Sequence, residues 1–415
     1  MTRQHHQPIL LTLFVALALC AGMLGACGQQ QQASTDEPAS SEATETGTET
    51  AEATGEDAQA STDSAPDEAA AQEASTASTT DPSQAFASWN ADSASLAKLI
   101  DYVQGVTDQA SPNYVEPEER VATFDMDGTL LCEKAPVYVD YCVLMHRVLE
   151  DPTYEAPAED KALLERIRAN ADEGILDSSL DEAKGQALVT AFADMTPEDF
   201  RAYVNEFIDT TEAEGFEGMT YGESVYQPMR EVVEYLKAND FEVYVVSACE
   251  REVARAISTS KLGVAPDHVI GTDCGTKATG QGDESALDYT FEQDDQIVFD
   301  GTMSPEVGKL NKVIYIEREI GIRPLLSFGN SSGDYAMLNY ALSNPDHEGM
   351  GFLVICDDVE REYGDLERAE KQTGEAEEAG WTTFSMADDW ATIYGDGVVK
   401  TELRADAEQE LAEAA

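Results

Sequence analysis

Basic residues are scarce in this 415-residue sequence. Lys and Arg together number 25 against 82 Asp and Glu, which gives a formal net charge of −57 at pH 7. A surface of that sign repels both the phosphate backbone of nucleic acids and the headgroups of anionic lipids. We therefore exclude nucleic acid as a partner and expect no electrostatic attachment to a membrane surface.

Cysteine is also sparse, and no CxxC spacing suggests a zinc site. Beyond the amino-terminal segment five cysteines remain, and their odd number leaves at least one thiol unpaired. We expect them to be small buried side chains, although a disulfide between the first two stays open. The five are Cys132, Cys142, Cys249, Cys274 and Cys356.

Long hydrophobic runs are confined to the amino terminus. Arg3 precedes the apolar run Ile9–Ala26, and small residues stand directly before Cys27. This arrangement resembles a bacterial lipoprotein signal, with residues 1–26 removed and the thiol of Cys27 lipidated. A transmembrane anchor is the alternative, because eighteen apolar residues are close to the spanning minimum. Either interpretation predicts an extracytoplasmic protein anchored to the cell membrane. For the lipoprotein, the expected partner is the membrane through the N-terminal lipid only.

Two polar segments are not expected to fold. Residues 27–85 are rich in Gln, Ser, Thr, Ala, Glu and Asp, and thirteen acidic residues but no Lys or Arg occur between Gly28 and Gln84. Such a tract is too polar and too like-charged to collapse, so we interpret it as a disordered acidic linker. Residues 406–415 form an acidic tail.

Between these segments, short hydrophobic runs alternate with amphipathic patterns. This alternation predicts the α/β class, with a doubly wound parallel sheet. An amphipathic helix is expected first, at Asp92–Thr107. Strands are expected at Arg120–Phe124, Phe241–Val246, Asp267–Gly271, Pro324–Phe328 and Gly351–Cys356.

A stretch of about a hundred residues between the first two strands is too long for an ordinary crossover connection. Its apolar spacing predicts an inserted helical domain over residues 136–234, and a β-hairpin is expected from Tyr289–Phe291 and Gln296–Phe299. The helices are expected at Val137–Leu149, Glu159–Ala169, Leu180–Met195, Pro197–Thr210 and Pro228–Lys237.

Candidate catalytic residues follow the first predicted strand in the sequence Asp-Met-Asp-Gly-Thr. Asp125 and Asp127 can face one centre only where the strand has ended and the loop curls, which Gly128 allows. A second polar residue, Ser247, ends the next predicted strand; it could also be a simple helix N-cap.

Two further segments complete the candidate site. Lys309 and Lys312 precede the strand at Pro324–Phe328, and Asn330 and Asp334 follow it in the sequence Gly-Asn-Ser-Ser-Gly-Asp.

These four segments resemble the motifs of the haloacid dehalogenase superfamily, and the helical insertion resembles the cap of its phosphoserine-phosphatase-like branch. The resemblance implies a core of residues 86–135 and 235–405, with the insertion as a cap. It makes Asp125 the phosphate-accepting nucleophile and Asp127 the general acid and base.

The same resemblance assigns the remaining site residues. Counting back from Ile320-Gly321 favours Lys312 over Lys309 as the phosphate-binding lysine. The resemblance assigns phosphate binding to Ser247, Lys312, Gly128 and Thr129. It assigns Mg²⁺ binding to Asp125, Asp127, Asn330 and Asp334. Asn330 departs from the usual pattern, in which an Asp binds the metal, and this puts the ligand set in doubt.

The expected function is Mg²⁺-dependent hydrolysis of small organic phosphate monoesters, such as phosphoserine or phosphocholine, by a monomer. A phosphotransferase or phosphomutase would use the same residues, and a non-catalytic lipoprotein binding module is a third alternative. The acidic cap and its aromatic residues also suggest cationic head groups. These aromatic residues are Tyr138, Tyr141, Phe192 and Tyr203.

Overall fold

The computed structural model describes residues 85–402. The predicted signal, the lipidated Cys27, nearly all of the linker and the acidic tail lie outside these residues and stay predictions. Within residues 85–402 no helix is long and apolar enough to cross a membrane.

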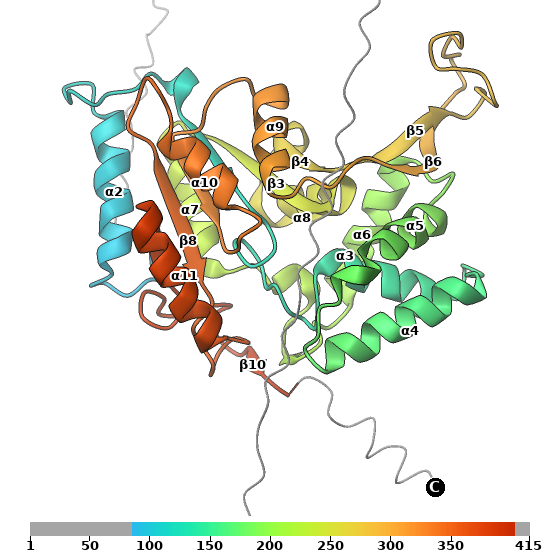
Figure 1. The fold of residues 1–415 in the computed structure, drawn as a ribbon, viewed down its shortest axis with the longest axis horizontal. Coiled ribbons are helices and arrows are strands. Elements are labelled where there is room, and N and C mark those ends of the chain that lie inside the picture. Colours follow the sequence, from blue (N-terminus) through green and yellow to red (C-terminus); the bar gives the residue numbers. More distant parts are fainter. Residues whose placement is uncertain (1–84, 403–415) are drawn as a thin grey trace, which may run out of the picture. The chain divides into compact units, whose positions relative to one another are not determined.

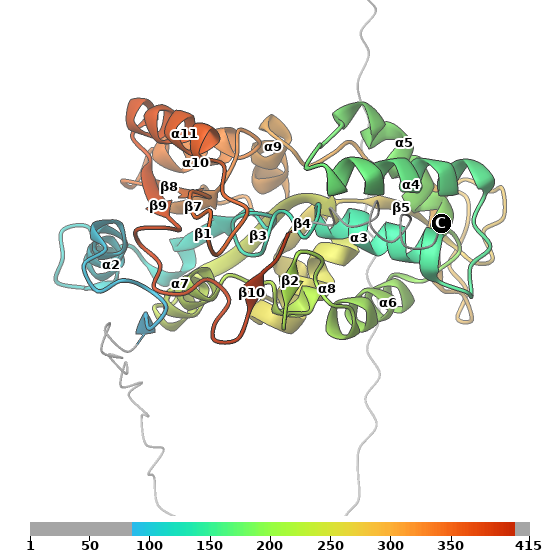
Figure 2. The ribbon, with the colours of Figure 1, turned by 90° about the horizontal axis from the view of Figure 1, so that it is seen from below.

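Six parallel strands form the central sheet in the order β4-β3-β1-β7-β8-β9. Helices cover both faces: α2, α7 and α8 lie on one side, and α9, α10 and α11 on the other (Figure 2). This confirms the predicted doubly wound α/β fold. The strands are β1 (Val121–Phe124), β3 (Glu242–Glu250), β4 (Val269–Thr272), β7 (Leu326–Gly329), β8 (Met350–Ile355) and β9 (Thr382–Ser385).

Of the flanking helices, α2 and α7 begin and end close to the predicted positions, Asp92–Thr107 and Pro228–Lys237. The first, α2, is capped by Ser93, whose hydroxyl accepts the N–H of Leu96 at 3.1 Å. Their bounds are α2 (Ala94–Thr107), α7 (Gln227–Ala238), α8 (Arg251–Leu262), α9 (Leu310–Glu319), α10 (Tyr335–Leu342) and α11 (Leu366–Ala379).

Helices inserted between β1 and β3 gather beside the hairpin of β5 and β6 (Figure 1). The helix predicted at Pro228–Lys237 differs from the others in this stretch, because α7 packs against β3 of the central sheet. The inserted helices are α3 (Val139–Met145), which continues as a π-helical turn over His146–Glu150, α4 (Ala158–Asp172), α5 (Asp181–Ala191) and α6 (Pro197–Thr210).

The predicted hairpin is correct in its second strand and wrong in its first. Strand β6 (Ile297–Met303) pairs antiparallel with β5 (Cys274–Ala278), in the register Ala278 to Ile297. The segment Tyr289–Phe291 lies in the connecting loop, where the hydroxyl of Tyr289 donates to Asp295 at 2.6 Å. Two short strands, β2 (Phe216–Glu217) and β10 (Val399–Lys400), form a separate antiparallel pair.

A row of stacked rings runs across the sheet directly below the candidate site. The rings of Phe124 and Phe328 lie 4.2 Å apart, and Phe352 is 4.9 Å from both Phe328 and Phe384. All four side chains are fully buried, so they fix the spacing of the strand ends that carry the polar residues.

The five cysteines of the described residues are free thiols. Cys132 and Cys142 therefore do not form the disulfide left open by the sequence. The thiol of Cys142 instead donates to the carbonyl oxygens of Ala135 and Val137, both at 3.6 Å.

Candidate active site

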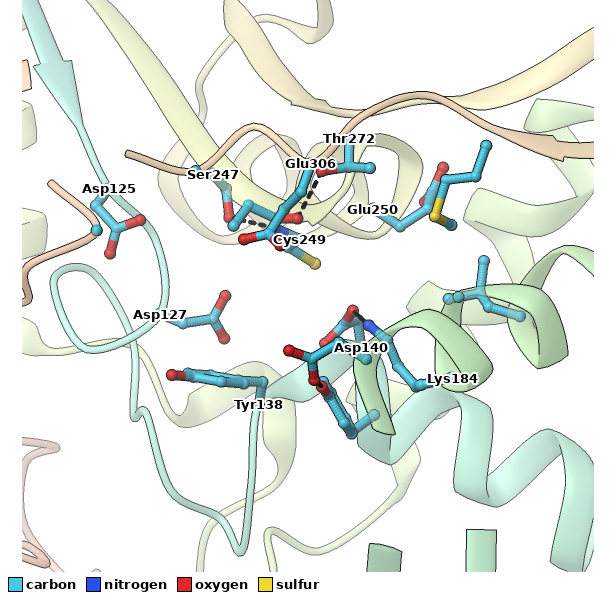
Figure 3. A pocket seen from close by; sticks show the side chains of 18 of the residues that line it. Asp125, Asp127, Tyr138, Asp140, Lys184, Ser247, Cys249, Glu250, Thr272 and Glu306 are labelled. Carbon is cyan, nitrogen blue, oxygen red and sulfur yellow. Dashed lines mark hydrogen bonds and ion pairs between the residues drawn. The ribbon is translucent and has the colours of Figure 1, made fainter. Parts of the chain in front are cut away.

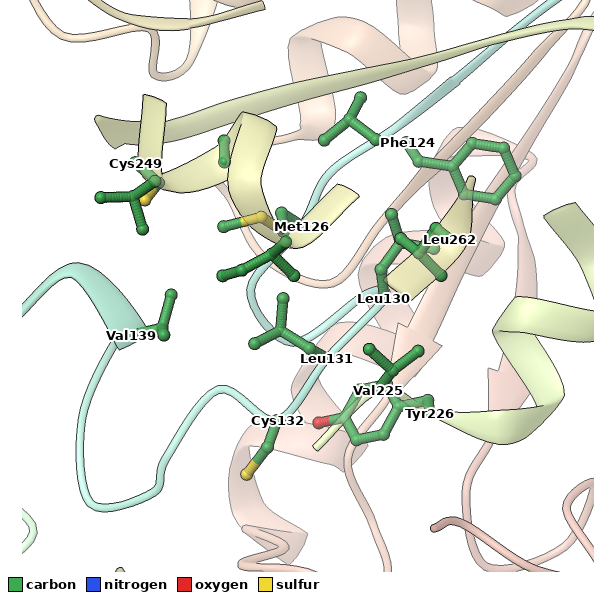
Figure 4. Close-up of a cluster of buried hydrophobic side chains, with 14 of the residues drawn as sticks. Phe124, Met126, Leu130, Leu131, Cys132, Val139, Val225, Tyr226, Cys249 and Leu262 are labelled. Atoms are coloured by element: carbon green, nitrogen blue, oxygen red, sulfur yellow. The ribbon is translucent and has the colours of Figure 1, made fainter. Parts of the chain in front are cut away.

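The loop after β1 presents Asp125 and Asp127 on one side and Met126 on the other. The carboxylates of Asp125 and Asp127 face the same cavity (Figure 3). The side chain of Met126 points into a hydrophobic cluster and is fully buried (Figure 4). Burial of Met126 thus anchors the loop and holds the two carboxylates toward the cavity.

Gly128 allows the sharp turn of this loop. Its φ is +83°, a conformation that side-chain-bearing residues rarely adopt. A Cβ atom at this position would also lie 1.9 Å from Nδ2 of Asn330. The glycine therefore lets the loops after β1 and β7 approach each other closely.

Lys312 on α9 joins two of the candidate segments. Its Nζ lies 2.5 Å from Oδ1 of Asp125 and 2.8 Å from Oδ1 of Asp334, and it donates to the carbonyl oxygen of Val246 at 2.7 Å. Only 1% of Lys312 is exposed. Lys309, in contrast, is exposed and has a φ of +54° just before α9.

Asp334 is held by both of its carboxylate oxygens. Oδ1 faces Lys312, and Oδ2 accepts the backbone N–H groups of Asn330 and Ser331, both at 3.0 Å. The carbonyl oxygen of Asn330 in turn accepts Nε2 of Gln372 at 2.6 Å. Asp334 therefore shapes the loop after β7 and orients Lys312.

Ser247 is buried near the end of β3 and lines the cavity. It is not the N-cap of the following helix, because β3 continues to Glu250, and Oε2 of Glu250 accepts the N–H of Val253 at 2.9 Å. The hydroxyl oxygen of Ser247 accepts the N–H of Cys249 at 3.1 Å, which leaves its own proton available to a ligand.

In the structure, Gly128 and Thr129 form hydrogen bonds with other groups of the protein, although phosphate binding was expected of them. Both N–H groups are paired within the loop, that of Gly128 with the carbonyl oxygen of Leu131 at 2.7 Å and that of Thr129 with Met126 at 3.2 Å. The hydroxyl of the fully buried Thr129 donates to Oδ2 of Asp125 at 3.2 Å. Neither residue is among those that line the cavity, and Thr129 instead contacts Asp125.

Burial raises the pKa of both aspartates of the loop. The pKa of Asp125 rises to about 7, because burial and then the charge of Asp334 outweigh the opposing effect of Lys312. The pKa of Asp127 is raised well above its usual value by burial, then by the charges of Asp140 and Asp125. Asp127 is therefore suited to hold a proton near neutral pH.

A cavity of about 590 Å³ extends from these residues toward the inserted helices. Most residues of its far wall were not predicted, because nothing in the local sequence pattern marks these positions. Glu250 carries one signal, its place at a helix start three residues after Ser247. The missed lining residues include Asp140, Lys184, Gly185, Glu250, Met303 and Glu306.

The four aromatic residues expected in the cap divide into two pairs. Tyr138 and Tyr141 line the cavity. Phe192 and Tyr203 do not, because their rings pack around the guanidinium of Arg147, at 5.6 and 5.4 Å. Those two rings belong to the cap interior, which corrects the expectation that all four face a ligand.

Among residues 85–402 no cluster of three or more His, Cys, Asp or Glu side chains is placed to hold a metal ion. The donors at the expected position are oxygen atoms of Asp125, Asn330 and the Asp127 backbone, a donor type that suits a hard divalent cation. Oδ1 of Asp127 is also buried without a hydrogen-bond partner. The donor chemistry therefore fits Mg²⁺, with Asp334 acting through Lys312 and the loop.

Comparisons with solved structures give distant similarities. A Bordetella pertussis Tohama I protein of unknown function is 17% identical, covers 64% of this chain and 98% of its own, and has a TM-score of 0.42. A conserved protein from Anaerococcus prevotii is 14% identical, with 70% and 91% covered and a TM-score of 0.43. A phosphoserine phosphohydrolase-like protein from Francisella tularensis is 13% identical, with 61% and 92% covered and a TM-score of 0.34. No curated protein matches the chain.

The sequence itself supplies the stronger finding. Residues 122–339 match the family described as haloacid dehalogenase-like hydrolase, a match that spans more than half of the chain. The matched region runs from β1 to α10 and includes all four candidate segments. The chain belongs to the haloacid dehalogenase-like hydrolase family.

Proposed function

We propose that the protein is a Mg²⁺-dependent phosphomonoesterase of the phosphoserine-phosphatase-like type that works through an aspartyl-phosphate. One observation carries the proposal: Asp125 lies on the wall of a cavity, with the buried ammonium group of Lys312 only 2.5 Å away. A carboxylate held beside a buried cation can act as a nucleophile toward a bound phosphate.

Two aspartates have different roles in the proposed reaction. A carboxylate oxygen of Asp125 attacks phosphorus, and the bond from phosphorus to the alcohol oxygen breaks. Asp127, protonated because its pKa is raised, gives its proton to the departing alcohol. The Asp127 carboxylate then takes a proton from water, which attacks phosphorus and releases Asp125.

The negative charge of the phosphate is stabilised by Lys312, Ser247 and the metal. The ammonium group of Lys312 and the hydroxyl of Ser247 face the phosphate oxygens, while Asp334 holds Lys312 in place. Mg²⁺, held by Asp125, Asn330 and the Asp127 carbonyl, would supply the positive charge that one lysine cannot provide to three carboxylates and a phosphate.

The cavity limits the substrate to a small molecule. A volume of about 590 Å³, closed in part by the inserted helices, fits an ester such as phosphoserine or phosphocholine and excludes a protein chain. Cleavage of phosphoglycolate or sugar phosphates far faster than both of these esters would contradict this substrate range.

The deciding experiment is hydrolysis of p-nitrophenyl phosphate by the purified protein, with and without Mg²⁺. Asp125→Asn removes the nucleophile, so we expect kcat to fall by about 10³-fold or more. Asp101→Asn, a matched change at an exposed position of α2, should leave kcat unchanged. Full activity of Asp125→Asn, or no turnover by the unaltered protein with any divalent metal, would reject the proposal.

A further inference from the structure

Asn330 offers a metal ion one neutral oxygen atom. An aspartate can bind a divalent cation through either carboxylate oxygen, whereas an asparagine binds it only through Oδ1. Asn330 lines the cavity, and its Nδ2 lies so close to Gly128 that a Cβ atom there would be 1.9 Å away. Metal affinity therefore depends on a backbone position at Asn330 that keeps the amide group in one orientation.

The backbone of Asn330 is held on both sides of the residue. Its N–H donates to Oδ2 of Asp334 at 3.0 Å, within the same loop. Its carbonyl oxygen accepts Nε2 of Gln372 at 2.6 Å, and Nη2 of Arg368 lies further away, at 3.5 Å. Gln372 is on α11, 42 residues along the chain, and only 6% of it is exposed. A buried amide at this distance fixes the peptide group that follows Asn330.

Two further contacts hold α11 against the loops of the site. Helix α11 lies beside α10 on one face of the sheet (Figure 2). Arg368, one turn before Gln372, donates to both carboxylate oxygens of Glu133, at 2.9 and 3.2 Å. Glu375 accepts the hydroxyl of Tyr335, the first residue of α10, at 2.6 Å. Gln372 lies between these contacts on the helix, so its amide group has a defined position relative to both loops.

We propose that Gln372 is a positioning residue for the metal site and acts through Asn330. This inference rests on the proposed function, whose Mg²⁺ site it concerns. The N–H of Gln372 holds the carbonyl oxygen of Asn330, and the fixed peptide group sets the direction in which the side chain of Asn330 leaves the backbone. Groups that orient a metal ligand in this way typically contribute about 10- to 100-fold to metal affinity.

Gln372→Met tests this role. The change keeps the length of the side chain and removes its N–H donor. Titration with Mn²⁺, whose free ion is counted by electron paramagnetic resonance, measures the affinity and the number of sites in the absence of substrate. We expect the Kd for Mn²⁺ to rise by about tenfold or more, with the number of sites unchanged.

The dependence of hydrolysis on Mg²⁺ is a second readout. With p-nitrophenyl phosphate, we expect the Mg²⁺ concentration for half-maximal activity to rise by about tenfold, while kcat at saturating Mg²⁺ stays within about threefold. A folding defect alone would lower the number of sites and reduce activity equally at every Mg²⁺ concentration. That pattern would overturn the inference.

Two other variants complete the comparison. Gln104→Met, the same change at an exposed position of α2, should leave the Kd unchanged. Gln372→Ala also lacks the donor and serves if the methionine is not tolerated. Equal Kd values for the unaltered protein and for the variants at Gln372 would overturn the inference.

Asn330→Asp tests whether the effect passes through Asn330. A carboxylate can bind through either oxygen, so its orientation matters less. Combined with Asn330→Asp, the change Gln372→Met should raise the Kd by only about threefold or less. An equal rise with asparagine and with aspartate at this position would show that Gln372 does not act through residue 330.

Metal binding separates this inference from the proposed function. A Kd that depends on Gln372, together with no hydrolysis of any ester, would reject the phosphatase and support the positioning role. Hydrolysis by the unaltered protein, together with a Kd that is independent of Gln372, would reject the positioning role alone. Failure of the unaltered protein to bind Mg²⁺ or Mn²⁺ would reject both.

Discussion

At the scale of single residues, the centre of the site is one buried cation between two carboxylates. Lys312 neutralises Asp125 and Asp334, which follow different strands, and it has almost no contact with solvent. Removing one member of such a buried cluster leaves unpaired charge in a region of low polarity, which costs more than the loss of one contact.

Lys312→Met tests this arrangement. The change keeps the length of the side chain and removes the charge, so Asp125 and Asp334 repel each other. We expect a loss of about 3–5 kcal/mol in the free energy of unfolding and of at least about 10²-fold in kcat. Urea unfolding and p-nitrophenyl phosphate hydrolysis measure the two effects.

Lys309→Met is the matched control for this prediction. Lys309 is exposed and three residues away, so its replacement should change the free energy of unfolding by less than about 0.5 kcal/mol. Equal destabilisation by both variants would contradict the central position of Lys312.

At the scale of secondary-structure elements, the far wall of the cavity is a contact between a helix and a strand. Gly185 of α5 and Met303 of β6 both line the cavity, and a Cβ atom on Gly185 would lie 3.3 Å from Sδ of Met303. The inserted helices and the hairpin thus meet where the alcohol part of a substrate would lie. The absence of a side chain at Gly185 keeps this space open.

Gly185→Leu should narrow the cavity. We expect kcat/KM for p-nitrophenyl phosphate relative to phosphoethanolamine to fall by about tenfold, because the larger leaving group loses room. Steady-state kinetics with the two esters measures the ratio.

Gly105→Leu provides the comparison for this substitution. Gly105 also lies within a helix, but a Cβ atom there meets nothing within 4 Å. Its replacement should raise the free energy of unfolding by up to about 0.8 kcal/mol through helix propensity and leave the ratio unchanged. A ratio altered equally in both variants would show that Gly185 does not control the size of the cavity.

At the scale of the whole molecule, the dominant property is the net charge of −57. Mutual repulsion of like charges destabilises a compact state, and salt screens it over about 8 Å at physiological ionic strength. We expect Tm to rise by several degrees between low salt and 0.5 M NaCl, as followed by circular dichroism.

The isoelectric point supplies a control for the salt effect. Near pH 4.1 the net charge vanishes, so the same increase in salt should change Tm little. A Tm that falls with salt at pH 7 would show that local ion pairs, such as Arg251 with Asp273 at 2.6 Å, outweigh the general repulsion.

The amino-acid sequence by itself determined the fold class and the family. These features depend on local patterns. A β-prone run that ends in Asp125, Asp127 and Gly128 marks the end of a buried strand, whatever lies beside it. The same local evidence found five of the six strands of the central sheet. It missed β9, which has only four residues and one fully buried apolar side chain, Phe384.

Only the tertiary structure decided which side chains meet. Lys312 contacts Asp125 because α9 packs on the sheet, although 187 residues separate the two. Lys309 does not take this place because of the geometry of the turn before α9. The pairing of β5 with β6 and the cavity wall at Gly185 and Met303 likewise depend on register and packing between distant segments. Such contacts are set by the free energy of the whole fold, so no local pattern records them.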